Sequence, residues 1–185
     1  MAVRDKHAQR YVSLKILIAS ESSKSTEGSI LSMLCSGDST HIGRQFVPRL
    51  LDEFTFDGPN EHHTCLVQEP EGCSVARSKE DSVNFMFPTE SARSIAAQLI
   101  MGVSYLHSRG VCHGDLHTRN FLLRGSNLDS LSTDELYNRY RLDKAPIRRV
   151  DGACRQSRRP NRYDTRYGTS FMVAGIMGVL PRHAK

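Results

Sequence analysis

Asp115 and Asn120 are the residues of this chain whose types and spacing point most directly to chemistry. An Asp followed five residues later by an Asn can place a carboxylate and an amide on the same side of one loop. The carboxylate can accept the proton of a substrate hydroxyl, and the amide oxygen can hold a magnesium ion against a phosphate. The pair therefore predicts phosphoryl transfer, with Asp115 as the base and Asn120 as the metal ligand. The alternative is a polar turn in which both side chains only hydrogen-bond their own backbone.

Two elements are expected to position this pair. The segment Thr89–His107 carries apolar residues at steps of three and four, which predicts a long helix with one apolar face. The residues on that face are Ala92, Ile95, Ala96, Leu99, Val103 and Leu106. Gly110 ends the helix, and the apolar run Phe121–Leu123 predicts a short strand directly after Asn120.

A second pair of charged residues lies near the start of the chain. The segment Tyr11–Leu17 alternates apolar and polar residues, which predicts a half-buried strand that carries Lys15. Twelve residues further on, Glu27 begins a run with apolar positions at helical intervals. Glu27 is therefore the natural ion-pair partner of Lys15. Gly28, beside it, is less favourable than Ala inside a helix by about 1 kcal/mol.

Between these two pairs, the segment Thr64–Gly72 begins as a short buried run and ends in a turn rich in Pro, Glu and Gly. It predicts a strand followed by a change of direction. The same pattern fits a strand and a loop in any α+β protein. Only its position in the sequence, between Lys15 and Asp115, groups this segment with the other elements.

In this order, the phrases QRYVSLKIL, HTCLVQEPEG, YLHSRGVCHGDLHTRN and NLDSLSTDELYNRY resemble the serine/arginine-rich-protein kinases, especially a divergent branch of that family. The resemblance covers residues 3–152. It implies an α+β fold, a fragment of the protein kinase fold with a small antiparallel β lobe that carries helix C, followed by the helical start of the large lobe. We expect a partial small lobe and hinge over residues 1–72 and a partial large lobe with the catalytic loop over residues 73–152. Residues 153–185 are expected to form a basic, disordered tail unrelated to this fold.

The resemblance also implies a nucleotide site. Lys15 would hold the α and β phosphates of ATP, and Glu27 would orient Lys15. Gln68 would be the gatekeeper side chain, with the carbonyl of Glu69 and the amide of Glu71 facing the adenine. ATP and Mg²⁺ are the implied cofactors, and the implied substrate is a protein with a reactive Ser, with Arg/Ser-rich sequences as candidates.

Three positions of the catalytic loop carry further implications. His113 matches the His of the kinase motif. Gly114 stands where many kinases have an Arg that pairs with a phosphorylated activation loop, so that mode of control is not expected. His117, a third candidate catalytic residue, replaces the Lys that usually steadies the transferring phosphate. Because His is neutral much of the time near pH 7, the replacement weakens the electrostatic support for the reaction.

Two family elements are missing from the sequence, which therefore resembles a kinase truncated at both ends. We find no glycine-rich loop before Lys15 and no Asp-Phe-Gly element after Asn120, and Asp151-Gly152 is expected to be a turn. A serine/threonine kinase with impaired catalysis and a catalytically dead, pseudokinase-like binding module are both compatible with these departures. HGDLH followed by Asn is also similar to small-molecule phosphotransferases that act on aminoglycosides or choline, which is the third alternative.

The charge distribution separates the tail from the rest. The 185 residues carry a net charge of +5, whereas residues 153–185 alone carry seven Lys or Arg and one Asp, so residues 1–152 sum to −1. Nucleic-acid binding is therefore not expected of the kinase-like part. For the tail, an RNA-binding arm and a surface-seeking peptide are alternatives to our preferred hypothesis, a shifted reading frame or an unspliced intron. Sequencing the transcript across the Gly152 codon would test that hypothesis.

Membrane spanning and a disulfide framework are not expected. The apolar run Phe171–Leu180 is shorter than the roughly 20 residues that a bilayer requires. The five cysteines lack the paired spacing of zinc sites or small secreted folds, and Met1 is soon followed by charged residues rather than by a signal peptide. We therefore expect a cytoplasmic or nuclear protein. The sequence carries no signal for an oligomeric state.

Overall fold

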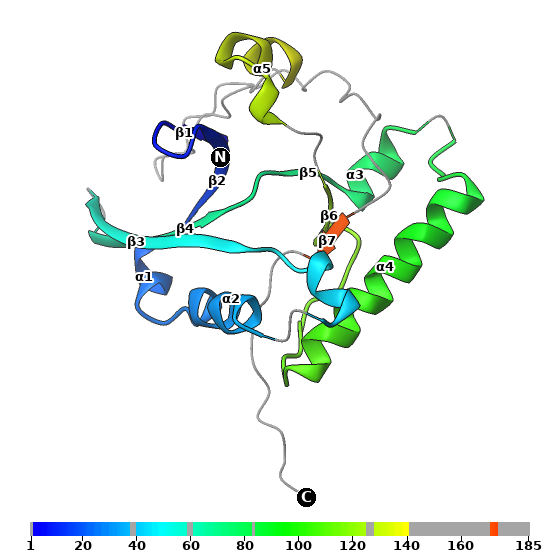
Figure 1. Ribbon diagram of the computed structural model, residues 1–185, viewed down its shortest axis with the longest axis horizontal. Coiled ribbons are helices and arrows are strands. Elements are labelled where there is room, and N and C mark those ends of the chain that lie inside the picture. The colour runs from blue at the N-terminus through cyan, green and yellow to red at the C-terminus, as the bar shows by residue number, and fades with distance from the viewer. Residues whose placement is uncertain are drawn as a thin grey trace, which may run out of the picture.

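The computed structural model describes residues 2–37, 40–58, 61–82, 84–124, 128–140 and 171–173. It contains an antiparallel sheet with two helices on one side of the molecule and a long helix on the other, with a short second sheet between them (Figure 1). This mixed architecture confirms the predicted α+β class.

The larger sheet has the strand order β1-β2-β4-β3, and every neighbouring pair in it is antiparallel. Its strands are β1 (Ala2–Asp5), β2 (Arg10–Ile16), β3 (Leu50–Gly58) and β4 (Glu61–Gln68). The predicted strand around Lys15 is therefore present as β2. In the register of β2 with β4, Ser13 lies opposite Gln68 and Lys15 opposite Leu66.

Two helices, α1 (Ala19–Ser22) and α2 (Glu27–Cys35), lie against this sheet (Figure 1). The apolar face of α2, formed by Ile30, Leu31 and Leu34, is buried. These positions recur at the three- and four-residue steps of a helix, so the predicted helix after Lys15 is confirmed.

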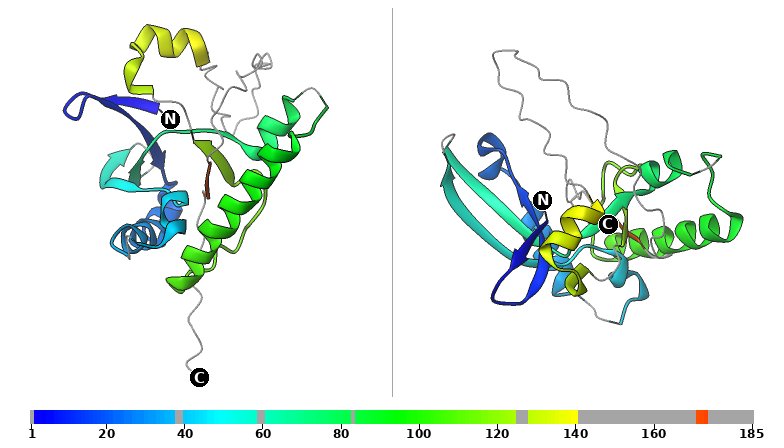
Figure 2. Two further views of the ribbon diagram at one scale, coloured as in Figure 1. Left: turned by 45° about the vertical axis from the view of Figure 1, so that its right-hand side comes forward. Right: turned by 90° about the horizontal axis from the view of Figure 1, so that it is seen from above.

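The rest of the described structure contains the long helix and the short sheet, and views from two further directions show it beside the larger sheet (Figure 2). Its elements are η1 (Ile42–Phe46), β5 (Glu71–Ser74), α3 (Val75–Glu80), α4 (Thr89–Ser108), β6 (Phe121–Arg124), η2 (Leu128–Ser130), α5 (Thr133–Tyr140) and β7 (Phe171–Val173). The short sheet has the order β5-β6-β7. The predicted long helix is α4, and the predicted strand after Asn120 is β6.

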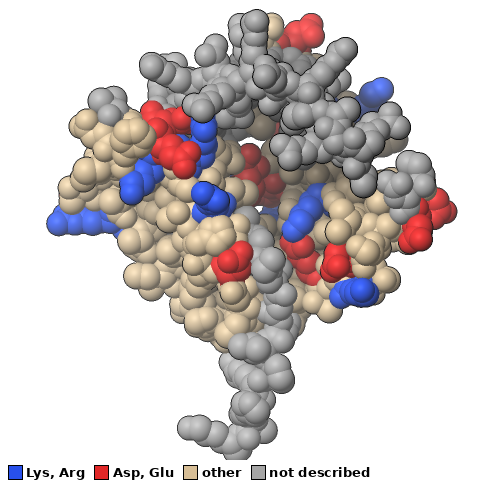
Figure 3. All heavy atoms as spheres, turned by 180° about the vertical axis from the view of Figure 1, so that it is seen from behind, with Lys and Arg blue, Asp and Glu red and all other residues tan. Residues whose placement is uncertain are grey.

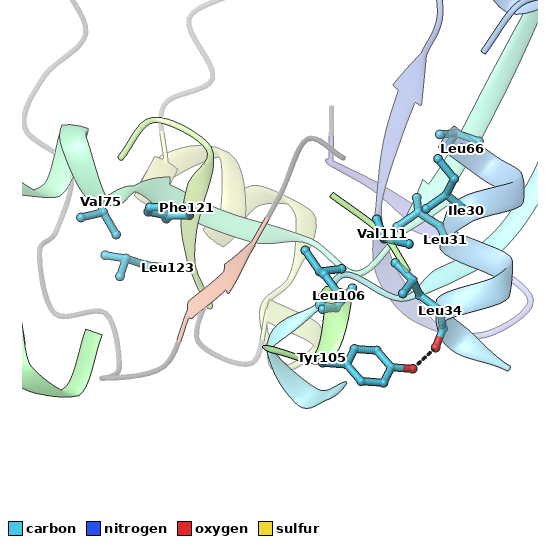
Figure 4. Packing of buried hydrophobic residues seen from close by; sticks show 11 residues of the cluster. Ile30, Leu31, Leu34, Leu66, Val75, Tyr105, Leu106, Val111, Phe121 and Leu123 are labelled. Atoms are coloured by element: carbon cyan, nitrogen blue, oxygen red, sulfur yellow. Dashed lines mark hydrogen bonds between the residues drawn. The ribbon is translucent and has the colours of Figure 1, made fainter. Parts of the chain in front are cut away.

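The core joins α2, α4 and the strands (Figure 4). Tyr105 of α4 is fully buried and donates its hydroxyl hydrogen to the carbonyl of Leu34 at 2.6 Å. Leu106 is buried as predicted, but Ala92 and Ala96 are exposed, so part of the predicted apolar face is wrong. The close approach of η1 to α4 occurs at Met101 and Tyr105, in the second half of the helix, whereas the two alanines lie in the first half.

The segment after β6 contains a capped helix. Ser132 accepts a hydrogen bond from the backbone N–H of Glu135, and the Glu135 carboxylate accepts one from the N–H of Ser132. This reciprocal arrangement is a capping box. Ser132 is therefore the N-cap of α5.

Part of the predicted tail lies in the short sheet. Strand β7 pairs with β6, and Val173 lies opposite Phe121. The remainder of residues 153–185, together with Asp151-Gly152, lies outside the described residues. Within the described parts of the chain, no helix is long and apolar enough to cross a membrane. Basic and acidic side chains are interspersed on the face seen from behind (Figure 3).

Candidate active site

Lys15 and Glu27 form the ion pair that their spacing predicted. The Lys15 Nζ lies 2.7 Å from both carboxylate oxygens of Glu27. The Lys15 side chain is 45% exposed, whereas that of Glu27 is only 13% exposed. Glu27 is thus held against the protein at the start of α2, while the lysine remains accessible from solvent.

The strand register adds Ser13 to this face of the sheet. Side chains two residues apart on a strand point to the same side, so Ser13 shares the face of Lys15. Gln68 lies opposite Ser13 on β4. Sequence reasoning did not select Ser13, although the period of two in Tyr11–Leu17 would have placed it beside Lys15.

The segment between β4 and β5 contains the other proposed adenine-binding residues. Glu69 turns its side chain toward Arg49, with 3.5 Å between the charged groups. Glu71 begins β5 and lies opposite Arg124 of β6. One of its carboxylate oxygens, Oε2, is buried and has no hydrogen-bond partner among the described residues.

Burial of the Glu71 carboxyl raises its pKa from the ordinary value of 4.5 to about 7. Desolvation is the largest cause, because a buried carboxylate loses its hydration. The Arg124 charge opposes the rise and the Glu69 charge adds to it. Glu71 is therefore a carboxyl group that changes its protonation state near neutral pH.

Asp115 and Asn120 meet as predicted in the loop before β6. The Asn120 side-chain amide donates to the Asp115 carboxylate at 2.9 Å and to the Asp115 carbonyl, also at 2.9 Å. The backbone N–H of Asn120 in turn donates to the His117 carbonyl at 2.8 Å. Because the amide nitrogen of Asn120 is engaged, its oxygen is the atom left to bind a metal.

His117 contacts the same carboxylate from the other side. Its Nε2 lies 3.3 Å from an Asp115 oxygen, and its Nδ1 accepts the backbone N–H of Arg119 at 3.2 Å. His117 is therefore held between the Asp115 carboxylate and the backbone of the same loop.

Two neighbours of Asp115 set the shape of the loop. His113 is buried, and its Nδ1 accepts the backbone N–H of Asp115 at 3.2 Å. Gly114 has φ of +80°, in the left-handed region that side chains disfavour. A glycine therefore allows the sharp turn that carries the Asp115 carboxylate past the buried histidine.

The two pairs remain separate in the structure. Among the described residues, no hydrogen bond or ion pair joins Lys15 or Glu27 to Asp115 or Asn120. Lys15 lies on β2 and Glu27 on α2, whereas Asp115 and Asn120 lie in the loop before β6.

Comparison with known proteins identifies this arrangement. A family model described as a protein kinase domain matches residues 1–174. The chain belongs to the protein kinase family. The kinase match includes β7, which pairs with the strand that follows Asn120.

Several curated kinases are similar to this chain. Protein kinase dsk1 of Schizosaccharomyces pombe is 33% identical over 123 residues, which are 64% of this chain and 23% of that protein. Serine/threonine-protein kinase spk-1 of Caenorhabditis elegans is 31% identical, covering 64% of this chain and 12% of that protein. SRSF protein kinase 3 of Homo sapiens is 28% identical, covering 64% of this chain and 22% of that protein. These matches confirm the predicted resemblance to the serine/arginine-rich-protein kinases.

A solved kinase domain supports the fold. It matches with a TM-score of 0.54 at 22% identity and covers 65% of this chain and 34% of the solved one. The chain spans about a quarter or less of the length of the three curated relatives. The predicted kinase fold is therefore confirmed, and this chain corresponds to only part of the length of these kinases.

Proposed function

We propose that this chain belongs to a serine/threonine protein kinase, with ATP bound on the Lys15 face of the sheet. The observation that carries the proposal is the Lys15–Glu27 ion pair at 2.7 Å. A lysine that is oriented by a carboxylate and is still accessible can contact the phosphates of a nucleotide. Ser13 and Gln68 share this region of the sheet by register, and the Glu69 carbonyl and Glu71 amide that follow β4 would face the adenine.

The residues of the loop before β6 fit the chemistry of phosphoryl transfer. Asp115 would accept the hydroxyl proton of the substrate while Asn120 and His117 hold its carboxylate in place by the hydrogen bonds described above. The Asn120 amide oxygen would bind Mg²⁺. When bound, the metal would neutralise charge on the phosphates, which is the largest electrostatic demand of the reaction.

The proposed substrate is the Ser of a protein, with Arg/Ser-rich sequences as the first candidates. This choice is supported by the similarity to SRSF protein kinase 3.

The second candidate function is that of a binding module without catalytic turnover. One specific observation favours it. The end of β7 lies beside Asn120, because Val173 is paired with Phe121. Residues 174–185, which follow this strand, contain no Asp or Glu. These residues therefore supply no carboxylate for a second metal. We propose that phosphoryl transfer by these 185 residues is impaired.

Thermal unfolding with and without ATP and Mg²⁺ tests the nucleotide site. Binding to the folded state alone raises the unfolding midpoint by mass action. We expect the midpoint of the wild-type chain to rise with ATP and Mg²⁺ and that of Lys15→Ala to stay unchanged. Lys24→Ala, on the loop before α2, is the matched control and should keep the rise. An equal rise in wild type and Lys15→Ala would refute Lys15 as a phosphate ligand.

Phosphate transfer to an Arg/Ser-rich peptide separates the kinase from the binding module. Incorporation that is lost in Asp115→Asn would support a working kinase with Asp115 as the base. A thermal shift without incorporation would support the binding module. Phosphorylation of choline or an aminoglycoside, with none of the peptide, would instead support the small-molecule phosphotransferase suggested by HGDLH.

A further inference from the structure

A cavity of about 820 Å³ borders the proposed adenine region at Glu69 but contains none of the residues proposed to bind the phosphates of ATP. Its walls come from the start of β2, the end of α2, the η1 region, the β4–β5 segment, α4, β6 and η2. Lys15, Glu27, Asp115 and Asn120 do not line it. Its size falls within the range of about 300–1,000 Å³ that is usual for small-molecule sites.

The charged side chains of this cavity are predominantly basic. Four arginines line it, against two carboxylates. The arginines are Arg10, Arg44, Arg49 and Arg124, and the acids are Glu69 and Asp129. Because the arginines come from separate segments of the chain, their convergence is a property of the fold.

Three of the arginines have contacts within the protein. Arg44 donates to the Cys35 carbonyl, Arg49 lies 3.5 Å from Glu69, and Arg124 donates to the Gln45 carbonyl at 3.4 Å. Carbonyl partners satisfy a hydrogen bond without neutralising the positive charge. Carboxylates lie near two of these arginines, because Glu69 faces Arg49 and Glu71 lies opposite Arg124 in the β5–β6 pair.

Arg10 is the decisive residue. Its Nε is buried and has no hydrogen-bond partner among the residues that the structure describes. A buried donor without an acceptor is unfavourable, and the penalty is larger for a charged group. Adjacent to Arg10, the backbone N–H of Tyr11 already engages Asp129 at 2.6 Å. A negatively charged hydrogen-bond acceptor in the cavity would therefore satisfy the buried Nε of Arg10.

We propose that this cavity binds a small anion carrying two or more phosphate groups. Guanidinium groups bind phosphate oxygens through paired, charge-assisted hydrogen bonds, which makes Arg the preferred side chain for such ligands. One phosphate would accept from Arg10, and the spread of the other arginines around the walls suits further phosphates. The site is distinct from the phosphate-binding part of the nucleotide site, since it shares none of the residues assigned to the phosphates of ATP.

Inorganic tripolyphosphate is a suitable probe, added without metal to the full chain and measured by calorimetry and by thermal unfolding. We expect binding to the wild type and to Lys15→Ala, because Lys15 lies outside the cavity. Arg10→Gln and Arg49→Gln should each weaken binding by about tenfold or more, since each removes charge-assisted bonds. Arg93→Gln is the matched control: Arg93 is a 73% exposed arginine on α4 that does not line the cavity.

Folding of the variants is checked by circular dichroism. Arg49 is 67% exposed, so Arg49→Gln tests the site even if Arg10→Gln does not fold. Absence of tripolyphosphate binding to the wild type would overturn the proposal. Unchanged binding in Arg49→Gln would also overturn it, and so would binding that is lost in Lys15→Ala, because the anion would then occupy the nucleotide site.

Discussion

At the scale of single residues, burial changes the chemistry of side chains that the sequence presents as ordinary. Glu71 was proposed as an adenine contact through its backbone amide. In the structure, burial also raises the pKa of its side-chain carboxyl to about 7. His117 was expected to weaken the electrostatics of the loop where the family has a Lys. In the structure its Nε2 contacts the Asp115 carboxylate and its Nδ1 accepts the backbone N–H of Arg119.

Glu71→Gln is expected to change the pH dependence of stability. The folded chain holds the Glu71 proton up to a pH of about 7, whereas the unfolded chain releases it near 4.5. Between these values the folded state binds more protons, so the free energy of unfolding falls as pH rises. At pH 8 the variant should be more stable than the wild type, by at most about 3 kcal/mol.

Urea unfolding at pH 5 and pH 8 measures this difference. Glu69→Gln is the matched control, because it removes a neighbouring carboxylate that is ion-paired with Arg49. A Glu71→Gln effect of the same size at both pH values would contradict the raised pKa of Glu71.

At the scale of elements, Gly28 is explained by a contact that no local pattern contains. A Cβ added at residue 28 would overlap the carboxylate of Glu53, which lies on β3. Glycine in the first turn of α2 therefore leaves room for the Glu53 side chain against the helix. The unfavourable helix propensity of Gly28 is the local consequence of this packing.

Gly28→Ala is expected to stabilise the protein more in a Glu53→Ala background than in the wild type. Ala improves helix propensity by about 1 kcal/mol in both backgrounds, but only the wild type must displace the Glu53 carboxylate. A double-mutant cycle by urea unfolding measures the coupling. Equal effects of Gly28→Ala in the two backgrounds would show that Glu53 does not restrict this position.

At the scale of the whole molecule, α2 and α4 are joined by a buried hydrogen bond between residues far apart in the sequence. The Tyr105 hydroxyl donates to the Leu34 carbonyl at 2.6 Å inside the core (Figure 4). Both residues also line the arginine-rich cavity. The bond therefore connects the half that carries Lys15 with the half that carries Asp115.

Tyr105→Phe should lower the free energy of unfolding by about 1–3 kcal/mol, because the buried Leu34 carbonyl loses its partner. Urea unfolding gives the value. Tyr11→Phe is the control: its hydroxyl donates to the Leu131 carbonyl at a longer 3.2 Å in a partly exposed setting, so the loss should be smaller. A Tyr105→Phe effect no larger than that of Tyr11→Phe would argue against a structural link through Tyr105.

The sequence by itself determined the elements that carry the candidate site. Periods of two and of three to four residues reflect the geometry of strands and helices, so they predicted β2 with Lys15, α2 with Glu27 and α4 before the catalytic loop. The spacing of Asp115 and Asn120 predicted their meeting, because five residues of one loop cannot separate far. The family resemblance could also be detected from the sequence, because it rests on short motifs that occur in a fixed order along the chain.

Only the tertiary structure decided what these elements pack against. The exposure of Ala92 and Ala96 depends on which neighbours cover α4, and the Glu71 pKa depends on burial between strands. The convergence of Arg10 and Arg124 on one cavity joins β2 to β6 across more than half of the chain. Such contacts depend on how elements are arranged in space, and local periodicity carries no information about partners that are distant in sequence.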